Sequence, residues 1–280
     1  MRLLSFDRGR IGLAQGAGLF DLTARLGIAD MRAALTRQPE IAAETAGAAP
    51  DLGLGEIRFG LPVPDPGRIF CIGVNYMNRN AEYGDATPPP RYPSVFMRSP
   101  LSFVGHGQAL EIPPESAQLD YEGEIVLVIG RQGRRIPAAR AMAHVAGLTI
   151  MNEGTIRDWV RHGKFNVTPG KNWDRSGSIG PWIETDLARL EPDDMKIETR
   201  VNGALRQSDS TASMAFPFGG IIEYLSTFAT LMPGDLIATG TPTGAGARLD
   251  PPRWLRAGDL VEVRVAGVGT LSNPVREEPR

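Results

Sequence analysis

Two glutamates stand two positions apart at the start of an apolar run. Residues 119–130 read LDYEGEIVLVIG, a stretch that suits a buried β-strand. Side chains two apart on a strand share a face, so Glu122 and Glu124 would meet beside a core that cannot solvate them. Such a pair requires a shared proton, neighbouring cations or a divalent metal, and oxygen ligands favour Mg²⁺, Mn²⁺ or Ca²⁺ over Zn²⁺ or Cu²⁺. The alternative is an edge strand with one solvated face.

A third carboxylate follows another apolar segment. Glu153 comes directly after GLTIMN and could complete an oxygen-rich triad with open positions for water and substrate. Alternatively, it caps a helix over residues 155–162. The neighbouring Arg157 and Asp158 suggest a structural pair near the start of that helix, and Asp120 is expected to support the glutamate pair or cap a turn.

Three further residues are candidates for binding or proton transfer. Lys171, in the loop VTPGKNWD, would stabilise negative charge on an anionic substrate beside a cation, unless it is simply solvated. The turn TGTPTGAG could present Thr241 and backbone N–H groups to a carboxylate, although it has neither P-loop nor Rossmann spacing. His162 is the best acid–base candidate of the three histidines. His106 and His144 suggest structural roles, and no zinc spacing is present.

Composition excludes several classes of protein. The chain has 280 residues, 42% of them apolar, with a net charge of −2 that argues against nucleic acid as a partner. No apolar run is long enough for a membrane span, and no signal peptide is recognised. The one cysteine, Cys71, is expected to be buried packing and fits a cytoplasmic location.

The arrangement of short apolar runs predicts a mainly β protein. Residues 1–66 form a small N-terminal domain with three strands, a helix around 31–35 capped by Asp30, and an alanine-rich connector; a proline-rich segment ends it. Residues 67–280 form the catalytic domain, with many strands separated by glycine and proline. Helices are expected over 137–144 and 218–230, besides the alternative helix after Glu153, and Asn202-Gly203 suits a type I′ hairpin turn.

In this order, the motifs resemble the fumarylacetoacetate hydrolase family. The matching blocks run from Arg68 to about Val275: RIFCIGVNY, SFVGHG, DYEGEIVLVIG, AHVAGLTIMNEGTIRD, GKNWD, VNGALRQ, LMPGDLIATGTPTG and GDLVEVRVAGVGTLSN. The resemblance implies a mixed β-sandwich roll (α+β) with a few covering helices, usually a homodimer, that binds Mg²⁺ or Mn²⁺. Carried over by position, the metal ligands are Glu122, Glu124 and Glu153.

Two positions depart from the family pattern. Glu153 stands where the family commonly has Asp, and its extra methylene changes how it can reach a metal. Many hydrolases of the family have N-Y-x-x-H-x-x-E, whose His/Glu pair activates water. Here the segment reads NYMNRNAE, so Glu82 is kept but Arg79 replaces the histidine. Arginine stays charged and is not an ordinary general base.

The predicted function is therefore a metal-dependent enzyme acting on a small dicarboxylate or 2-oxo acid. The favoured reaction is hydrolysis of a C–C bond in an acylpyruvate-like substrate through an enolate. The alternatives are an isomerase or decarboxylase of aromatic catabolism and a non-catalytic metal-binding member. The catalytic candidates are Glu82, Lys171, Arg79 and His162, and the substrate-binding candidates are Tyr76, Arg79, Lys171 and Thr241.

Overall fold

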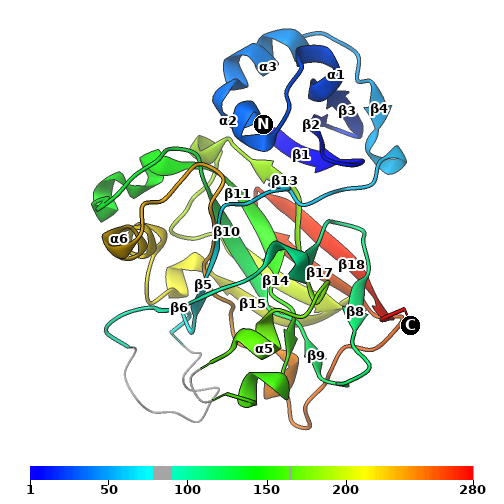
Figure 1. Cartoon of the computed structure of the whole chain (residues 1–280), viewed down its shortest axis with the longest axis vertical. Coiled ribbons are helices and arrows are strands. Elements are labelled where there is room, and N and C mark those ends of the chain that lie inside the picture. Colours follow the sequence, from blue (N-terminus) through cyan, green and yellow to red (C-terminus); the bar gives the residue numbers. More distant parts are fainter. Residues whose placement is uncertain (78–89, 164–165, 280) are drawn as a thin grey trace.

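Two β-sheets packed against each other form the centre of the protein in a computed structural model that describes residues 1–77, 90–163 and 166–279 (Figure 1). The architecture is mainly β with few helices, as predicted. None of the helices in these ranges is long and apolar enough to span a membrane.

The larger sheet runs through the whole molecule. Its strand order is β4-β3-β2-β1-β13-β11-β10-β16-β5-β6, and β7 pairs with β13. Most neighbours are antiparallel, but β16 pairs with β5 and β13 with β7 in parallel. The strands are β1 (Arg2–Phe6), β2 (Arg10–Gln15), β3 (Gly18–Asp21), β4 (Leu52–Gly53), β5 (Ile69–Gly73), β6 (Ser94–Met97), β7 (Phe103–Val104), β10 (Gly123–Ile129), β11 (Val145–Asn152), β13 (Gly177–Glu184) and β16 (Leu236–Ala238).

The smaller sheet covers one face of β10, β11 and β13. Its order is β15-β14-β17-β18-β8, with only β18 and β8 parallel. Its strands are β8 (Leu110–Ile112), β14 (Lys196–Val201), β15 (Ala204–Ser210), β17 (Leu260–Val265) and β18 (Gly269–Glu277), while β9 (Leu119–Asp120) and β12 (Thr155–Ile156) form a separate pair. Asn202 and Gly203 both have positive φ between β14 and β15, which confirms the predicted tight turn.

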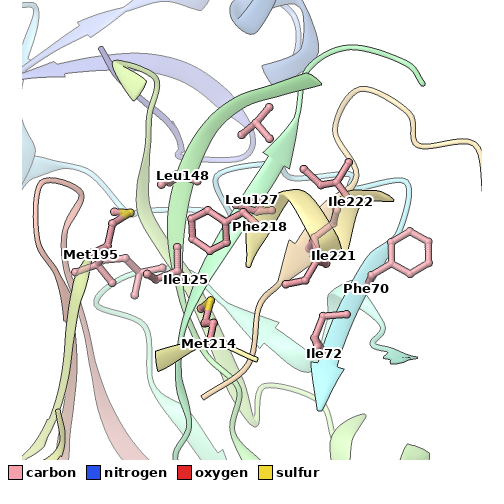
Figure 2. Close-up of a cluster of buried hydrophobic side chains, with 14 of the residues drawn as sticks. Phe70, Ile72, Ile125, Leu127, Leu148, Met195, Met214, Phe218, Ile221 and Ile222 are labelled. Carbon is pink, nitrogen blue, oxygen red and sulfur yellow. The ribbon is translucent and has the colours of Figure 1, made fainter. Parts of the chain in front are cut away.

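From Ile125 to Ile129, strand β10 is apolar because both of its faces are covered. Ile125 and Leu127 belong to a core shared with the smaller sheet and helix α6 (Phe218–Phe228). Val126 and Val128 face the other way, into a core shared with the N-terminal elements. Figure 2 shows the first of these cores, where Phe218, Ile221 and Ile222 of α6 lie among Phe70, Ile72, Ile125 and Leu127.

The N-terminal elements extend the larger sheet, since β1 pairs with β13. They also include α1 (Leu22–Leu26), α2 (Met31–Thr36) and α3 (Gln38–Thr45), drawn in blue in Figure 1. The Asp30 side chain accepts a hydrogen bond from the Ala33 N–H, which confirms the predicted cap. The division after residue 66 stays a prediction.

Two local predictions were wrong and one was confirmed. Part of the alanine-rich connector is helical, because α3 continues to Thr45. The helix predicted over 137–144 is confirmed, as a 3₁₀-helix over Ala138–His144. The helix expected over 155–162 is replaced by β12 and one 3₁₀ turn, Trp159–Arg161, because Thr155 and Ile156 pair with β9. The remaining short elements are α5 (Thr168–Lys171) and 3₁₀ turns at Leu54–Glu56, Pro100–Ser102, Leu187–Arg189, Thr211–Ser213 and Gly246–Arg248.

Candidate metal centre

The fold brings the three predicted glutamates together. Glu122 precedes β10, Glu124 is its second residue, and Glu153 follows the neighbouring strand β11. Gly123 lies opposite Asn152 in the β10–β11 register, and the Glu153 N–H donates to the Glu122 carbonyl over 2.7 Å. One carboxylate oxygen from each glutamate lies within 4.8 Å of the others, and all three side chains are buried.

Lys171 lies between two of these carboxylates. Its Nζ donates to Glu122 Oε2 over 2.6 Å and to Glu153 Oε2 over 2.8 Å. Burial alone would lower the pKa of Lys171, but Glu122 and Glu153 outweigh burial and raise it. The lysine is therefore a buried, charged part of the cluster, carried by the short helix α5.

Arg157 supplies a second cation and corrects the predicted pairing with Asp158. Its Nε donates to Asp120 over 2.7 Å and its Nη2 to Glu122 Oε1 over 2.5 Å. Asp158 instead accepts from the Ser116 hydroxyl. Asp120 is thus linked to Glu122 through Arg157, and it also accepts from the Gly246 and Ala247 N–H groups at the start of a 3₁₀ turn, so both of its expected roles are confirmed.

Among the described residues, no lysine or arginine forms an ion pair with Glu124, which lies against the glycine-rich turn. Its Oε2 accepts from the Gly240 N–H over 2.8 Å. Burial, together with the charges of Glu153 and Glu122, holds the pKa of Glu124 well above its usual value. Gly240 has φ +99°, and a Cβ there would press on Asn75, so this close approach requires glycine. The turn thus presents a backbone N–H to Glu124.

The cluster fits a divalent cation of the hard, oxygen-binding kind. Within the part of the chain that the structure describes, the buried Glu153 Oε1 has no hydrogen-bond partner, although Oε2 of the same group contacts Lys171. A buried carboxylate oxygen without a partner is energetically costly. A divalent ion would satisfy Glu153 Oε1 and lower the pKa of Glu124 by stabilising its ionised form.

Tyr76 and Thr241 are both buried in this region of the fold. The Tyr76 hydroxyl has no hydrogen-bond partner in residues 1–77, 90–163 and 166–279, and its pKa is raised by burial and by the charge of Glu124. Thr241 Oγ1 accepts from Gln207 Nε2 over 2.9 Å. Gln207 Oε1 in turn accepts from the Gly123 N–H, between the two strand glutamates. Their substrate-binding roles stay predictions.

The remaining catalytic candidates lie elsewhere or outside the described residues. His162 is exposed, and its ring lies 4.3 Å from that of Trp159. His106 accepts from the Ser272 N–H, and His144 contacts the Arg131 carbonyl. Arg79 and Glu82 fall in the segment outside the described ranges, so their expected roles stay predictions.

Sequence reasoning missed the contributions of Arg157 and Gln207 to the cluster. Arg157 lies only four residues after Glu153 in the block NEGTIRD, which was a usable signal. Gln207 had no such signal, because it comes from β15 of the other sheet.

A two-sheet β fold that buries three carboxylates with two cations defines an acidic-triad centre. The model of the family described as "Fumarylacetoacetate (FAA) hydrolase C-terminal" matches residues 68–276. The chain therefore belongs to the fumarylacetoacetate hydrolase family.

The relatives of this chain include proteins of more than one activity. It is 43% identical over 225 residues to the oxaloacetate tautomerase YisK of Bacillus subtilis (strain 168), covering 79% of this chain and 74% of that one. The 5-carboxymethyl-2-hydroxymuconate delta-isomerase of Mycobacterium smegmatis is 28% identical with a TM-score of 0.78. The maleylpyruvate hydrolase of Sphingobium sp. SYK-6, solved in complex with manganese(II) ion and pyruvate, is 26% identical with a TM-score of 0.84. Both solved structures match over the full length of both chains.

Proposed function

We propose that this protein is a divalent-metal-dependent tautomerase that interconverts the enol and keto forms of a small 2-oxo dicarboxylate of the oxaloacetate class. The supporting observation is the set of three buried glutamates beside Lys171, with one carboxylate oxygen unpartnered. Similarity to an oxaloacetate tautomerase supports the choice of reaction. The proposal moves the function from the predicted hydrolase to the predicted isomerase alternative.

The residues divide the work between them. Glu122, Glu124 and Glu153 would hold Mg²⁺ or Mn²⁺, which when bound supplies Lewis-acid polarisation of the 2-oxo oxygen. Lys171 holds two of these carboxylates in place and adds a positive charge toward the substrate's carboxylate. A buried position strengthens that attraction because little water screens it.

The groups that each reaction requires favour tautomerisation over hydrolysis for this chain. Tautomerisation removes the proton of the enol hydroxyl and adds a proton to the α-carbon, the far carbon of the enol double bond, and it consumes no water. Hydrolysis needs a positioned water and a base, yet Arg79 replaces the histidine of the family's usual dyad. The chain's three histidines all lie in the described ranges, and each makes its contacts away from the glutamates.

The segment with Arg79 and Glu82 completes the proposal. Arg79 would bind the distal carboxylate of the substrate, since guanidinium groups match carboxylates with two parallel hydrogen bonds. Glu82 would transfer the proton, directly or through a water. Tyr76 and Thr241 would line the substrate site.

Hydrolysis of an acylpyruvate-like substrate is the second candidate. The fold similarity to a maleylpyruvate hydrolase bound to manganese and pyruvate supports it. The two reactions are separated by their products, because only hydrolysis releases two acids.

The test uses the full chain with Mg²⁺ or Mn²⁺. Decay of enol absorbance with oxaloacetate measures tautomerisation, and release of pyruvate from acylpyruvates measures hydrolysis. Glu124→Gln should lower the tautomerase rate by at least about 100-fold while the protein stays folded. Glu223→Gln on the exposed face of α6 is the matched control and should keep the rate. A chelated or Glu124→Gln protein with the full rate would overturn the proposal.

We also propose that the protein works as a homodimer in the cytoplasm, as the family resemblance and the single cysteine predicted. Size-exclusion chromatography with light scattering measures the mass of the protein in solution, and the mass of a single chain would contradict the dimer.

A further inference from the structure

Arg98 is a buried cation whose hydrogen-bond partners among the described residues are all uncharged. It follows β6 and is 4% exposed. Its guanidinium donates to the Gly154 carbonyl (2.9 Å), the Ser176 hydroxyl (3.0 Å), and the hydroxyl and carbonyl of Ser102. It also lies 4.2 Å from the centre of the Phe103 ring. A buried charge without an ion pair is expensive, so neutral hydrogen bonds alone do not explain an arginine here.

The hydrogen bonds of Arg98 hold the chain directly after Glu153. Gly154 makes a tight turn in which its N–H donates to the Asn152 carbonyl over 2.9 Å. A Cβ at Gly154 would overlap the Ser176 carbonyl oxygen, so the two segments touch through backbone. Arg98 bridges the same two segments through the Gly154 carbonyl and the Ser176 hydroxyl. Its guanidinium therefore fixes where the backbone of Glu153 lies.

Glu153 is thus held from two sides. Lys171 contacts Oε2 of its carboxylate, whereas Arg98 holds the backbone beyond it and leaves Oε1 without a partner. The charge of Arg98 also acts on the glutamates through space. Burial lowers the pKa of Arg98, while the charges of Glu153, Glu122 and Glu124 oppose that change.

We propose that Arg98 is a positioning residue for the metal centre, which orients Glu153 Oε1 toward the ion and offsets the repulsion among the three glutamates. This inference rests on the metal site of the proposed function. The sequence motifs did not indicate Arg98, and among the described residues its hydrogen bonds go to Gly154, Ser176 and Ser102 and not to the glutamates.

Titration of Mn²⁺ into the full-length protein tests this role. Arg98→Lys keeps the charge but cannot make all the hydrogen bonds, and should weaken Mn²⁺ binding about 10-fold. Arg98→Met loses both the charge and the hydrogen bonds and should weaken Mn²⁺ binding about 100-fold. The EPR signal of bound Mn²⁺ should also change shape, because Glu153 shifts.

A second arginine provides the matched control. Arg68 also lies over a phenylalanine ring, that of Phe70 at 5.1 Å, but pairs with Asp235. Arg68→Met should lower thermal stability and leave the Mn²⁺ dissociation constant unchanged. If Arg98 were merely structural, Arg98→Met would likewise lower thermal stability and leave the Mn²⁺ dissociation constant unchanged.

The outcomes separate this inference from the proposed function. Folded Arg98→Met that binds Mn²⁺ as tightly as the wild type overturns the positioning role and leaves the metal site standing. Should Arg98→Met not fold, unchanged affinity in Arg98→Lys overturns it equally. A wild-type protein that binds no Mn²⁺ overturns both proposals at once.

Discussion

In both the N-terminal elements and the glutamate cluster, one basic side chain pairs with two carboxylates, but the first set lies at the surface and the second is buried. In the N-terminal part, Arg25 donates to Asp51 over 2.7 Å and to Glu44 over 3.4 Å at the surface. In the cluster, Lys171 donates to Glu122 over 2.6 Å and to Glu153 over 2.8 Å, and all three side chains are buried. Each region has one cation between two carboxylates, and the two regions differ in how far water reaches these groups.

Access to water decides whether an ion pair only adds a little to folding stability or also changes the chemistry of its carboxylates. At the surface, water screens the Arg25 pairs, and the charged groups would be well solvated without them. In the interior, each carboxylate depends on its neighbours, so removing one cation leaves an uncompensated charge. The cluster accordingly keeps one glutamate, Glu124, with a strongly raised pKa and one oxygen of Glu153 without a partner.

Removing the buried cation should give the largest effect. Lys171→Met leaves Glu153 without its cation, and we expect a loss of about 3 kcal/mol in unfolding free energy. Tautomerase activity should fall at least about 100-fold, because the variant also lacks the charge beside the substrate. Urea denaturation and the oxaloacetate assay measure both. Added Mn²⁺ should restore part of the stability, and an unchanged unfolding free energy would contradict the burial argument.

Changing pH should give an intermediate effect through Glu124. Its folded-state pKa lies above the usual 4.5, so above pH 4.5 the metal-free folded protein holds a proton that the unfolded chain releases. This contribution to stability is present below pH 4.5 and is lost as pH rises through the raised pKa. Mn²⁺ binding needs the ionised carboxylate, so stabilisation by Mn²⁺ should increase with pH.

Thermal unfolding with and without Mn²⁺ across a pH series measures these opposite slopes. Glu124→Gln cannot titrate and serves as the control, since its own contribution to both slopes should vanish. Parallel slopes in the variant and the wild type would show that another group is responsible.

Removing the surface cation should give the smallest effect. Arg25→Met deletes the pairs with Asp51 and Glu44, and we expect a change in Tm of no more than about 2 °C and an unchanged enzymatic rate. The stabilising contribution should also shrink in high salt, because the pairs are exposed. A loss as large as that of Lys171→Met would remove the contrast between the two regions.

The sequence was most informative where local pattern and chemistry coincide. The alternation of Glu122 and Glu124 before the run IVLVI was enough to predict that both would share a face, since side chains on a strand alternate. The cap at Asp30 and the turn at Asn202-Gly203 followed from backbone preferences of single residues. Glu153 could be added because of its position after an apolar strand and the order of the family motifs.

Contacts between distant segments could not be predicted in this way. The helix expected after Glu153 gave way to β12 because its partner strand β9 lies more than 30 residues earlier, where no local preference records it. For the same reason Arg157 was paired with its neighbour Asp158 instead of with Asp120 and Glu122.

The sequence by itself determined which groups could bind a hard metal ion and that the fold would be mainly β. Only the tertiary structure decided which charges surround them: Lys171 and Arg157 within the cluster, Arg98 behind Glu153, and Gly240 against Glu124. The physical reason is that residue type and spacing fix the local direction of a side chain. The pKa of a carboxylate instead depends on burial and on charges brought near it by strands far apart in the chain.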